Sequence, residues 1–201
     1  MIDDEKINKF VNDLSIPTHS KYKEPEIINA IKMLIDHDSN ISWVNKFEQT
    51  FAKRIGVNHA IACNSGTSGL HAALYAVGVQ EGDEVLLPAM TVIMDAYTIM
   101  HLGAIPVFVD VDERSHLMDI SDLKNKLSPK TKAILTVSWE GVSCEMSEIM
   151  SIAKSRGLYV IDDSARNVMG SYKGQNTGSI ADMTVFSMES KKHLTAGSEG
   201  G

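Results

Sequence analysis

The sequence has 201 residues, of which 43% are hydrophobic and 22% are charged, a composition typical of a globular protein with one sizeable core. Its net charge of −7 argues against nucleic acid as the main partner, because an acidic surface repels a phosphate backbone. No apolar run reaches bilayer length, and the N-terminus does not have the layout of a signal peptide. The two cysteines, Cys63 and Cys144, are too few for a disulfide framework or a zinc site. We therefore expect a cytoplasmic protein without a metal or a membrane partner.

Residues 1–58 predict two helices, at 24–38 and 43–56, which we interpret as an N-terminal helical lead-in. From residue 59 onward, apolar β-branched runs alternate with segments of helical periodicity. The predicted strands cover residues 59–63, 83–89, 105–112, 132–138, 158–165 and 181–187, and the predicted helices cover residues 67–78, 92–103, 120–128 and 147–157. Ser121 is the expected cap of the third of these helices. The alternation indicates βαβ units, and hence an α/β fold: a three-layer α/β/α sandwich with a mixed, mostly parallel sheet.

The first polar cluster lies in "CNSGTSGLH", between a predicted strand and a predicted helix. The strand ends at Cys63 and the helix begins near Thr67, with Gly66 in the turn. Backbone N–H groups at a helix start, together with hydroxyls, can cradle an anion. The pattern is neither a Walker A loop nor GxGxxG, so it does not indicate a nucleoside triphosphate or a dinucleotide. A capped turn without a ligand is the alternative interpretation.

The second polar cluster is the acid pair Asp162 and Asp163, which follows the buried run "LYVI". Strand alternation points the two side chains to opposite faces of the sheet. One of them is therefore expected to face a pocket at the sheet edge, where its carboxylate could hold a cationic ring nitrogen. A turn-forming acid pair is the alternative.

The third polar cluster follows the last predicted strand, which ends at Ser187. Ser187 could add a hydroxyl to an anion site, and the adjacent lysines Lys191 and Lys192 come shortly after it. A lysine in a partly desolvated pocket is a nucleophilic amine that forms Schiff bases with aldehydes. The alternative is a solvated lysine pair on a loop, because most lysines are exposed.

Read together, the three clusters supply an anion cradle, an acid for a ring nitrogen and a Schiff-base lysine, the protein groups that pyridoxal phosphate needs. At this point the chain resembles the N-terminal part of a sugar aminotransferase of the DegT/DnrJ/EryC1/StrS family, whose large domain has the aspartate-aminotransferase type of fold. The matching residues extend from about Trp43 to Gly201. They include "FEQTFAKRIGV", "NSGTSGLHAAL", "GDEVLLPAMT", "LGAIPVFVDVD", "VIDDSA", "SYKGQNTGS" and "FSMESKKHLTAGSEGG".

The resemblance implies a role for each matching site residue. The positions that hold the cofactor phosphate are Gly66, Thr67, Ser68 and Ser187. Asp163 is implied to pair with the pyridine nitrogen and keep it protonated, and Lys192 to form the Schiff base with the cofactor aldehyde. Two positions depart from the usual pattern: Val92 stands where an aromatic residue usually covers the cofactor ring, and Arg166 stands where Gln or His usually lies near the phenolic oxygen. The stretch "VSWEGV" also departs from the usual "YG" neighbourhood.

The lysine position depends on the direction of counting. Counting forward from "FS" places it on Lys192, whereas counting back from "EGG" places it on His193. We favour Lys192, because both the preceding "FS" and the following "HLT" support the forward count. The choice matters, since relatives with a histidine at this position remove a sugar 3-hydroxyl instead of transferring an amine.

The resemblance therefore implies transamination of a nucleotide-linked keto sugar, with glutamate or glutamine as amino donor and pyridoxal 5'-phosphate as cofactor. Residues 59–201 are the expected cofactor-binding large domain of a longer protein whose small C-terminal domain follows, and which forms a homodimer. A sugar dehydratase and a non-catalytic fragment are the alternatives. Produced alone, the 201-residue chain is expected to aggregate in part, to bind the cofactor weakly and not to turn over substrate.

Overall fold

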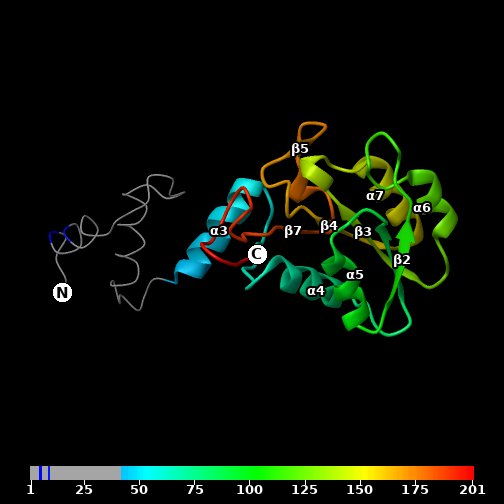
Figure 1. Ribbon diagram of the computed structural model, residues 1–201, viewed down its shortest axis with the longest axis horizontal. Coiled ribbons are helices and arrows are strands. Elements are labelled where there is room, and N and C mark those ends of the chain that lie inside the picture. Colours follow the sequence, from blue (N-terminus) through cyan, green and yellow to red (C-terminus); the bar gives the residue numbers. More distant parts are fainter. Residues whose placement is uncertain (1–4, 6–8, 10–41) are drawn as a thin grey trace. The chain divides into compact units, whose positions relative to one another are not determined.

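The computed structural model describes residues 42–201 together with Glu5 and Lys9. The helix expected at 24–38 lies outside the described residues. Residues 47–201 form one compact unit, which Figure 1 shows as a sheet with helices around it. Among the residues that the structure describes, no helix combines the length and the apolar character needed to cross a membrane.

The centre of this unit is a five-stranded sheet with the order β2-β1-β3-β4-β7. All four pairings are parallel. The strands are β1 Glu84–Pro88, β2 Ile105–Val109, β3 Thr131–Val137, β4 Tyr159–Asp163 and β7 Met183–Val185. A small antiparallel hairpin, β5 Ser171–Tyr172 with β6 Gln175–Asn176, stands apart from this sheet.

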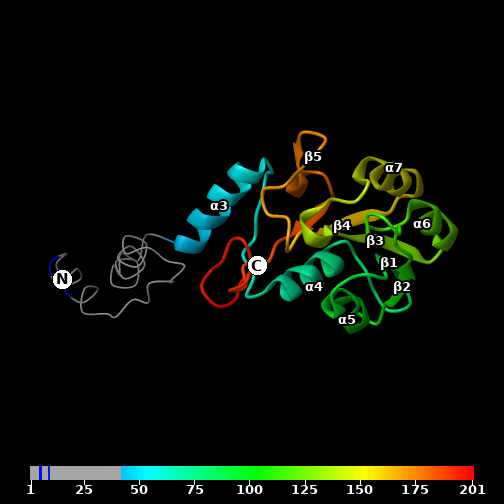
Figure 2. The ribbon, with the colours of Figure 1, turned by 45° about the horizontal axis from the view of Figure 1, so that its top comes forward.

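Helices cover both faces of the sheet. The α-helices are α3 Trp43–Ile55, α4 Gly66–Ala76, α5 Ile93–His101, α6 Ile120–Lys126 and α7 Met146–Arg156, and the short 3-10 turns are η1 Trp139–Gly141 and η2 Thr177–Ser179. Figures 1 and 2 show α4 and α5 on one side of the strands and α6 and α7 on the other. This arrangement confirms the predicted three-layer α/β/α architecture.

The core divides into two apolar clusters, one on each face of the sheet, because successive strand residues point in opposite directions. In β1, Val85 and Leu87 pack with the cluster under α4 and α5, whereas Leu86 packs with the cluster under α6 and α7. All three side chains are fully buried. Strands covered on both faces explain why the sequence of each central strand is continuously apolar.

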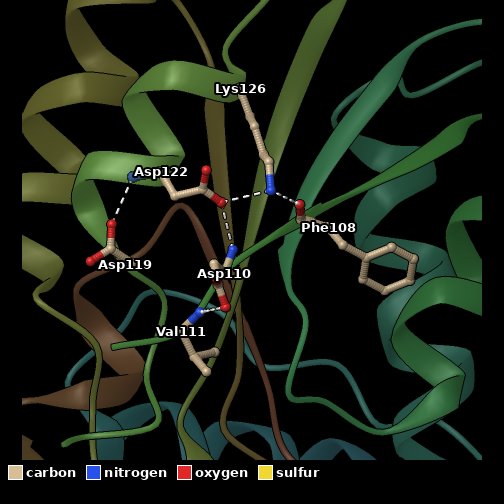
Figure 3. A network of polar contacts seen from close by, with 6 residues as sticks. All are labelled: Phe108, Asp110, Val111, Asp119, Asp122 and Lys126. Atoms are coloured by element: carbon tan, nitrogen blue, oxygen red, sulfur yellow. Dashed lines mark hydrogen bonds and ion pairs between the residues drawn. The ribbon is translucent and has the colours of Figure 1, made fainter. Parts of the chain in front are cut away.

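Helix α6 is capped by Asp119, not by Ser121 as the sequence predicts. The Asp119 side chain accepts a hydrogen bond from the N–H of Asp122 at 2.7 Å, the third-residue geometry of an N-cap. Asp122 in turn accepts from the N–H of Asp110 at 2.6 Å and from Nζ of Lys126 at 2.7 Å. Figure 3 shows this network, which ties the end of β2 to the start and end of α6.

The strand predicted at residues 59–63 does not form. The N–H of Ala62 donates to a carboxylate oxygen of Glu48 at 2.8 Å. The N–H of Cys63 donates to the carbonyl of Gly201 at 2.8 Å, and the N–H of Gly201 donates back at 3.0 Å. One reciprocal pair does not make a ladder, so the alternating apolar pattern alone was an insufficient signal.

Strand β7 is shorter than predicted and ends at Val185 instead of Ser187. Its last partner is Asp163, the final residue of β4, so no neighbouring strand extends beyond this point. Beyond Val185 the chain pairs with itself: the N–H of Met188 donates to Gly200 at 2.8 Å, and the N–H of Ala196 donates to Met188 at 3.0 Å. Ser187 therefore lies on a loop that leaves the sheet edge.

Candidate functional site

The predicted polar clusters meet at the edge formed by the carboxyl ends of the parallel strands. Asp163 ends β4, and the loop with Ser187 and Lys192 follows β7. Helices α4 and α5 begin at the same edge, since α4 packs against β4 and β7 and α5 packs against β1 and β2. Ligands bind at this edge in open parallel sheets, because the connecting loops leave side chains free there.

The start of α4 is built as an anion cradle. Ser65 is its N-cap: its Oγ accepts a hydrogen bond from the N–H of Ser68 at 3.1 Å and lies 3.0 Å from Oγ of Ser68. The N–H groups of Gly66 and Thr67 stand in the same first turn, where a helix offers no acceptor of its own. Ser65 is a cap that our reading of the sequence missed, although serine three residues before the first engaged N–H is a common signal.

Gly66 and Ser187 lie directly against one another. A Cβ atom built on Gly66 would stand 3.1 Å from the Cβ of Ser187, which is tighter than ordinary van der Waals contact. The absence of a side chain at Gly66 thus lets the loop after β7 approach the helix start. The structure therefore brings Ser187 to the cradle, as the sequence predicts.

Gly201 supports the cradle from behind. A Cβ atom there would lie 2.6 Å from the carbonyl carbon of Ser65 and 2.7 Å from the nitrogen of Gly66. Only glycine fits at this distance, because backbone atoms cannot yield as a flexible side chain can. The sequence marked "SEGG" only as a turn, so this packing role was missed.

The acid pair divides between the two faces of the sheet, as predicted. Asp162 is 2% exposed and accepts hydrogen bonds from the hydroxyls of Thr136 at 2.7 Å and Ser138 at 3.3 Å, on the face that α7 covers. Burial raises the pKa of Asp162 to about 6. Asp163 is 5% exposed and accepts from the N–H of Ala165 at 2.8 Å. Asp162 is thus structural, and Asp163 is the acid at the site.

Asp163 is buried among charged groups that the sequence analysis also selected. Burial raises the pKa of Asp163, while the N–H of Ala165 and the cationic side chains of Lys192 and Arg166 act to lower it. Both cations therefore lie within electrostatic reach of this carboxyl. The structure brings Asp163, Lys192 and Arg166 together, although Arg166 itself is exposed in the turn after β4.

The two adjacent lysines differ in their surroundings. Lys191 is exposed, and its N–H donates to a carboxylate oxygen of Glu189 at 3.0 Å. Lys192 is half-buried, its N–H donates to the carbonyl of Glu189 at 2.9 Å, and its charge acts on Asp163. Two hydrogen bonds hold the pKa of Glu189 below its usual range. The larger effect comes from the hydroxyl of Ser190 and the smaller from the N–H of Lys191. Of the two lysines, Lys192 is the one whose charge acts on the acid of the site.

Val92 and the segment after β3 border the same edge. Val92 precedes α5, where it makes no side-chain cap, and it is 44% exposed. After β3 the chain enters the turn Trp139–Gly141, in which Glu140 has the strained positive φ of 51°. The departures at Val92 and in "VSWEGV" thus fall on surface that borders the site.

Asp95 is a buried acid that our reading of the sequence missed. It is 0% exposed in the first turn of α5, and its Oδ2 accepts a hydrogen bond from the hydroxyl of Thr91. Burial, followed by the charge of Asp163, raises the pKa of Asp95 to about 8. A signal was available, since Asp95 shares the helical face of the buried Ile99 four residues later.

The fold is an α/β domain in which a capped helix start, a buried acid and a half-buried lysine lie at the carboxyl ends of a parallel sheet. The model of the DegT/DnrJ/EryC1/StrS aminotransferase family matches residues 22–201, and the chain belongs to that family.

Curated relatives with similar sequences carry names of nucleotide-sugar enzymes. The GDP-perosamine synthase of Escherichia coli O157:H7 is 40% identical over 179 residues, which are 89% of this chain and 49% of that protein. The UDP-N-acetyl-3-dehydro-alpha-D-glucosamine 3-aminotransferase of Acidithiobacillus ferrooxidans is 36% identical over 196 residues, which are 96% of this chain and 53% of that protein. The chain thus spans about half the length of the curated relatives it matches.

Solved structures have the same fold. The aminotransferase from Psychrobacter cryohalolentis superposes with a TM-score of 0.84 at 33% identity, covering 92% of this chain and 47% of that one. The 3-amino-5-hydroxybenzoic acid synthase superposes with a TM-score of 0.85 at 30% identity, covering 92% and 49%. A Streptococcus pneumoniae protein assigned as a sugar aminotransferase is known in a PLP form, with a TM-score of 0.83 at 29% identity over 89% of this chain and 50% of that one.

Proposed function

We propose that this chain is the cofactor-binding part of a pyridoxal-phosphate-dependent aminotransferase that aminates a nucleotide-linked keto sugar, with glutamate or glutamine as donor. The observation that carries the proposal is that the cradle at Gly66, the buried Asp163 and the half-buried Lys192 meet at one sheet edge. Family membership and the names of the relatives support it.

The residues present fit pyridoxal phosphate. The close approach of Gly66 to Ser187 leaves backbone N–H groups and hydroxyls at the helix start, which suits a phosphate dianion. Asp163 supplies a buried carboxylate for the pyridine nitrogen, and Lys192 supplies an amine for the aldehyde. Thr67 and Ser68 complete the set of phosphate donors. When bound, this cofactor withdraws electrons from the carbon that carries the transferred amine and so makes a C–H bond there acidic.

Lys192 then acts as the base and acid of the transfer. With the cofactor bound, Nζ of Lys192 would be the group that takes the proton from Cα of the amino donor and returns a proton later in the transfer. The half-buried position of Lys192 suits this task, because the amine must reach the reacting carbon while bulk water is kept away from that carbon. Asp163 would meanwhile keep the ring nitrogen of the bound cofactor protonated.

Val92 and Arg166 shape the rest of the site. Val92 would offer an aliphatic face to the cofactor ring in place of an aromatic side chain. The exposed guanidinium of Arg166 would stabilise the phenolic oxygen or bind an anionic group of the substrate. A nucleotide-linked sugar carries such an anionic group in its diphosphate.

The wider assignments belong to this proposal as well. Residues 1–58 are a helical lead-in and residues 59–201 are the large domain, a division by expected role. The whole protein works in the cytoplasm as a homodimer, without a nucleic-acid or membrane partner. The protein's own solution mass, measured by sedimentation, tests the dimer.

Amine transfer from glutamate or glutamine tests the reaction itself. The whole protein, loaded with pyridoxal phosphate, should convert either donor into its oxo acid, and the amine should appear on a keto-sugar nucleotide. A dehydratase would instead release water from the sugar without placing the donor's amine on it. A non-catalytic protein would leave donor and sugar unchanged with every keto-sugar nucleotide supplied, and either result would overturn the proposal.

A further inference from the structure

We propose that Asp95 is a neutral carboxylic acid that donates a hydrogen bond to the carboxylate of Asp163, so that the two side chains hold one proton between them. Asp95 is thereby a positioning residue for the acid of the site. The effect of Asp95 on cofactor binding rests on the proposed function, whereas the existence of the acid pair does not.

The first support is the burial of Asp95 in an apolar setting. Asp95 is 0% exposed, and its neighbours on the helix, Ala96 and Ile99, belong to the apolar cluster under α4 and α5. An ionised carboxylate in such surroundings needs a counter-charge or several donors. The hydroxyl of Thr91 serves one oxygen, Oδ2. Within the described part of the chain, no donor reaches the other oxygen, Oδ1.

The second support is the neighbour that Asp95 faces. Asp95 and Asp163 act on each other: Asp163 raises the pKa of Asp95, and Asp95 lowers the pKa of Asp163. Two ionised carboxylates have no proton to share, so this contact is a hydrogen bond only if one of the two acids is neutral. Closely spaced carboxyls in a buried site hold a proton because both cannot ionise together. A single proton therefore accounts for the contact and for the oxygen without a donor.

The surroundings assign the proton to Asp95. Asp163 accepts from the N–H of Ala165 at 2.8 Å and has the charges of Lys192 and Arg166 nearby, all of which stabilise its ionised form. The charged groups that act on Asp95 are acids: Asp163 and, through the sheet from its other face, Asp162. The positive end of α5 favours a carboxylate only modestly.

Other titratable groups around α5 lie away from this pair. On α4, His71 is in ring contact with His101 at the last residue of α5, with centroids 6.1 Å apart. Tyr97 also contacts His101, at 5.7 Å. The pKa of about 8 for Asp95, raised by burial and by Asp163, agrees with the geometry. Asp95 should thus be neutral at about pH 7 and lose its proton as the pH rises through about 8.

This state suits the proposed reaction. A neutral Asp95 stabilises Asp163 as a carboxylate, the form that can hold a proton on a ring nitrogen. The structure thus supplies the acid of the site with a hydrogen-bond donor from a helix at the same edge.

Infrared spectroscopy of the whole, cofactor-free protein tests the pair, since a protonated carboxyl has a carbonyl stretching band that a carboxylate lacks. At about pH 7, above the pKa of about 6 of Asp162, wild type should show one such band. Asp95→Asn should remove it, and the control Asp112→Asn, at an exposed acid, should leave it. In Asp163→Asn the band should remain, with its titration midpoint moved to lower pH. A wild type without the band, or a band that survives Asp95→Asn and is lost in Asp163→Asn, would overturn the assignment.

A second arm uses the cofactor and separates the two proposals. Asp95→Asn keeps an N–H donor toward Asp163, whereas Asp95→Ala does not, so Ala should weaken pyridoxal phosphate binding about tenfold while Asn restores it. Equal weakening by both would contradict the donor role. If wild type binds no pyridoxal phosphate, the proposed function fails, and the infrared result still decides the acid pair.

Discussion

Asp162 and Asp163 are adjacent in the chain and lie on opposite faces of one sheet. Asp162 is enclosed by the hydroxyls of Thr136 and Ser138, whereas Asp163 faces the edge where α4 and α5 begin. The period of two in a strand therefore assigns a structural role to one acid and a site role to the other.

Asp163→Asn should leave cofactor binding measurable and remove most turnover. The ring nitrogen would lose the carboxylate that keeps it protonated, a charge-assisted interaction whose loss costs a few kcal/mol in the transition state. We expect kcat to fall by on the order of 100-fold or more. Steady-state kinetics of the whole protein measures it. Unchanged turnover would assign the role elsewhere, with Asp162 the first residue to examine.

Asp95 should make the cofactor-free fold less stable as the pH rises. Its pKa is about 8 in the folded protein and about 4 when unfolded, so between these values the folded state binds more protons. The stabilising contribution is complete below about pH 4 and is lost as the pH rises through about 8. Urea unfolding between about pH 6.5 and 8 should show the free energy of unfolding falling by about 1 kcal/mol per pH unit.

Asp95→Asn is the matched test of that slope. The amide has the same shape and cannot ionise, so the fall in stability above about pH 6.5 should disappear. Below that range the raised pKa of Asp162, about 6, adds a slope of the same sign in both proteins. An equal slope for wild type and variant above about pH 6.5 would place the titrating group elsewhere.

Gly66→Ala should weaken cofactor binding through contact with Ser187. The new Cβ would stand 3.1 Å from the Cβ of Ser187, so the loop after β7 must shift away from the cradle. In the background of Ser187→Gly that contact is absent, and adding Gly66→Ala should cause little further loss. Equilibrium binding of pyridoxal phosphate to the four proteins forms a double-mutant cycle. Fully additive losses would show that the contact does not matter.

Asp119→Ala should destabilise the fold by about 1 kcal/mol, because helix α6 loses its N-cap. Ser121→Ala, two residues away on an exposed position, should change stability by less than about 0.5 kcal/mol. Urea denaturation distinguishes them. A larger loss of stability in Ser121→Ala than in Asp119→Ala would show that Ser121 caps the helix, as the sequence predicted.

Most of the architecture could be predicted from local patterns. Continuous apolar runs and helical spacing located all five parallel strands and the helices between them, because burial on both faces leaves a strong sequence signal. The strand predictions were wrong where the presence of a pairing partner decides whether a segment forms a strand and where the strand ends. Residues 59–63 read as a strand but pair only at Cys63 with Gly201, and β7 stops where β4 stops.

Residue type alone singled out Asp163 and the lysine pair, and the roles assigned to them stay predictions. Neighbours that are set by packing could not be found in this way. Asp95 and Asp163 come near each other only in the folded domain, where α5 packs against α4, β1 and β2, and their spacing in the sequence does not reveal this. The packing of Gly201 on Ser65 is of the same kind.

The attachment point of the cofactor tests the account most directly. The whole protein would be incubated with pyridoxal phosphate, reduced with borohydride, digested and mapped by mass spectrometry. If Lys192 is the Schiff-base residue, the label lies on Nζ of Lys192, Lys192→Ala abolishes it and Lys191→Ala retains it. A label on Lys191, or no covalent label on protein that binds the cofactor, would contradict the proposed site.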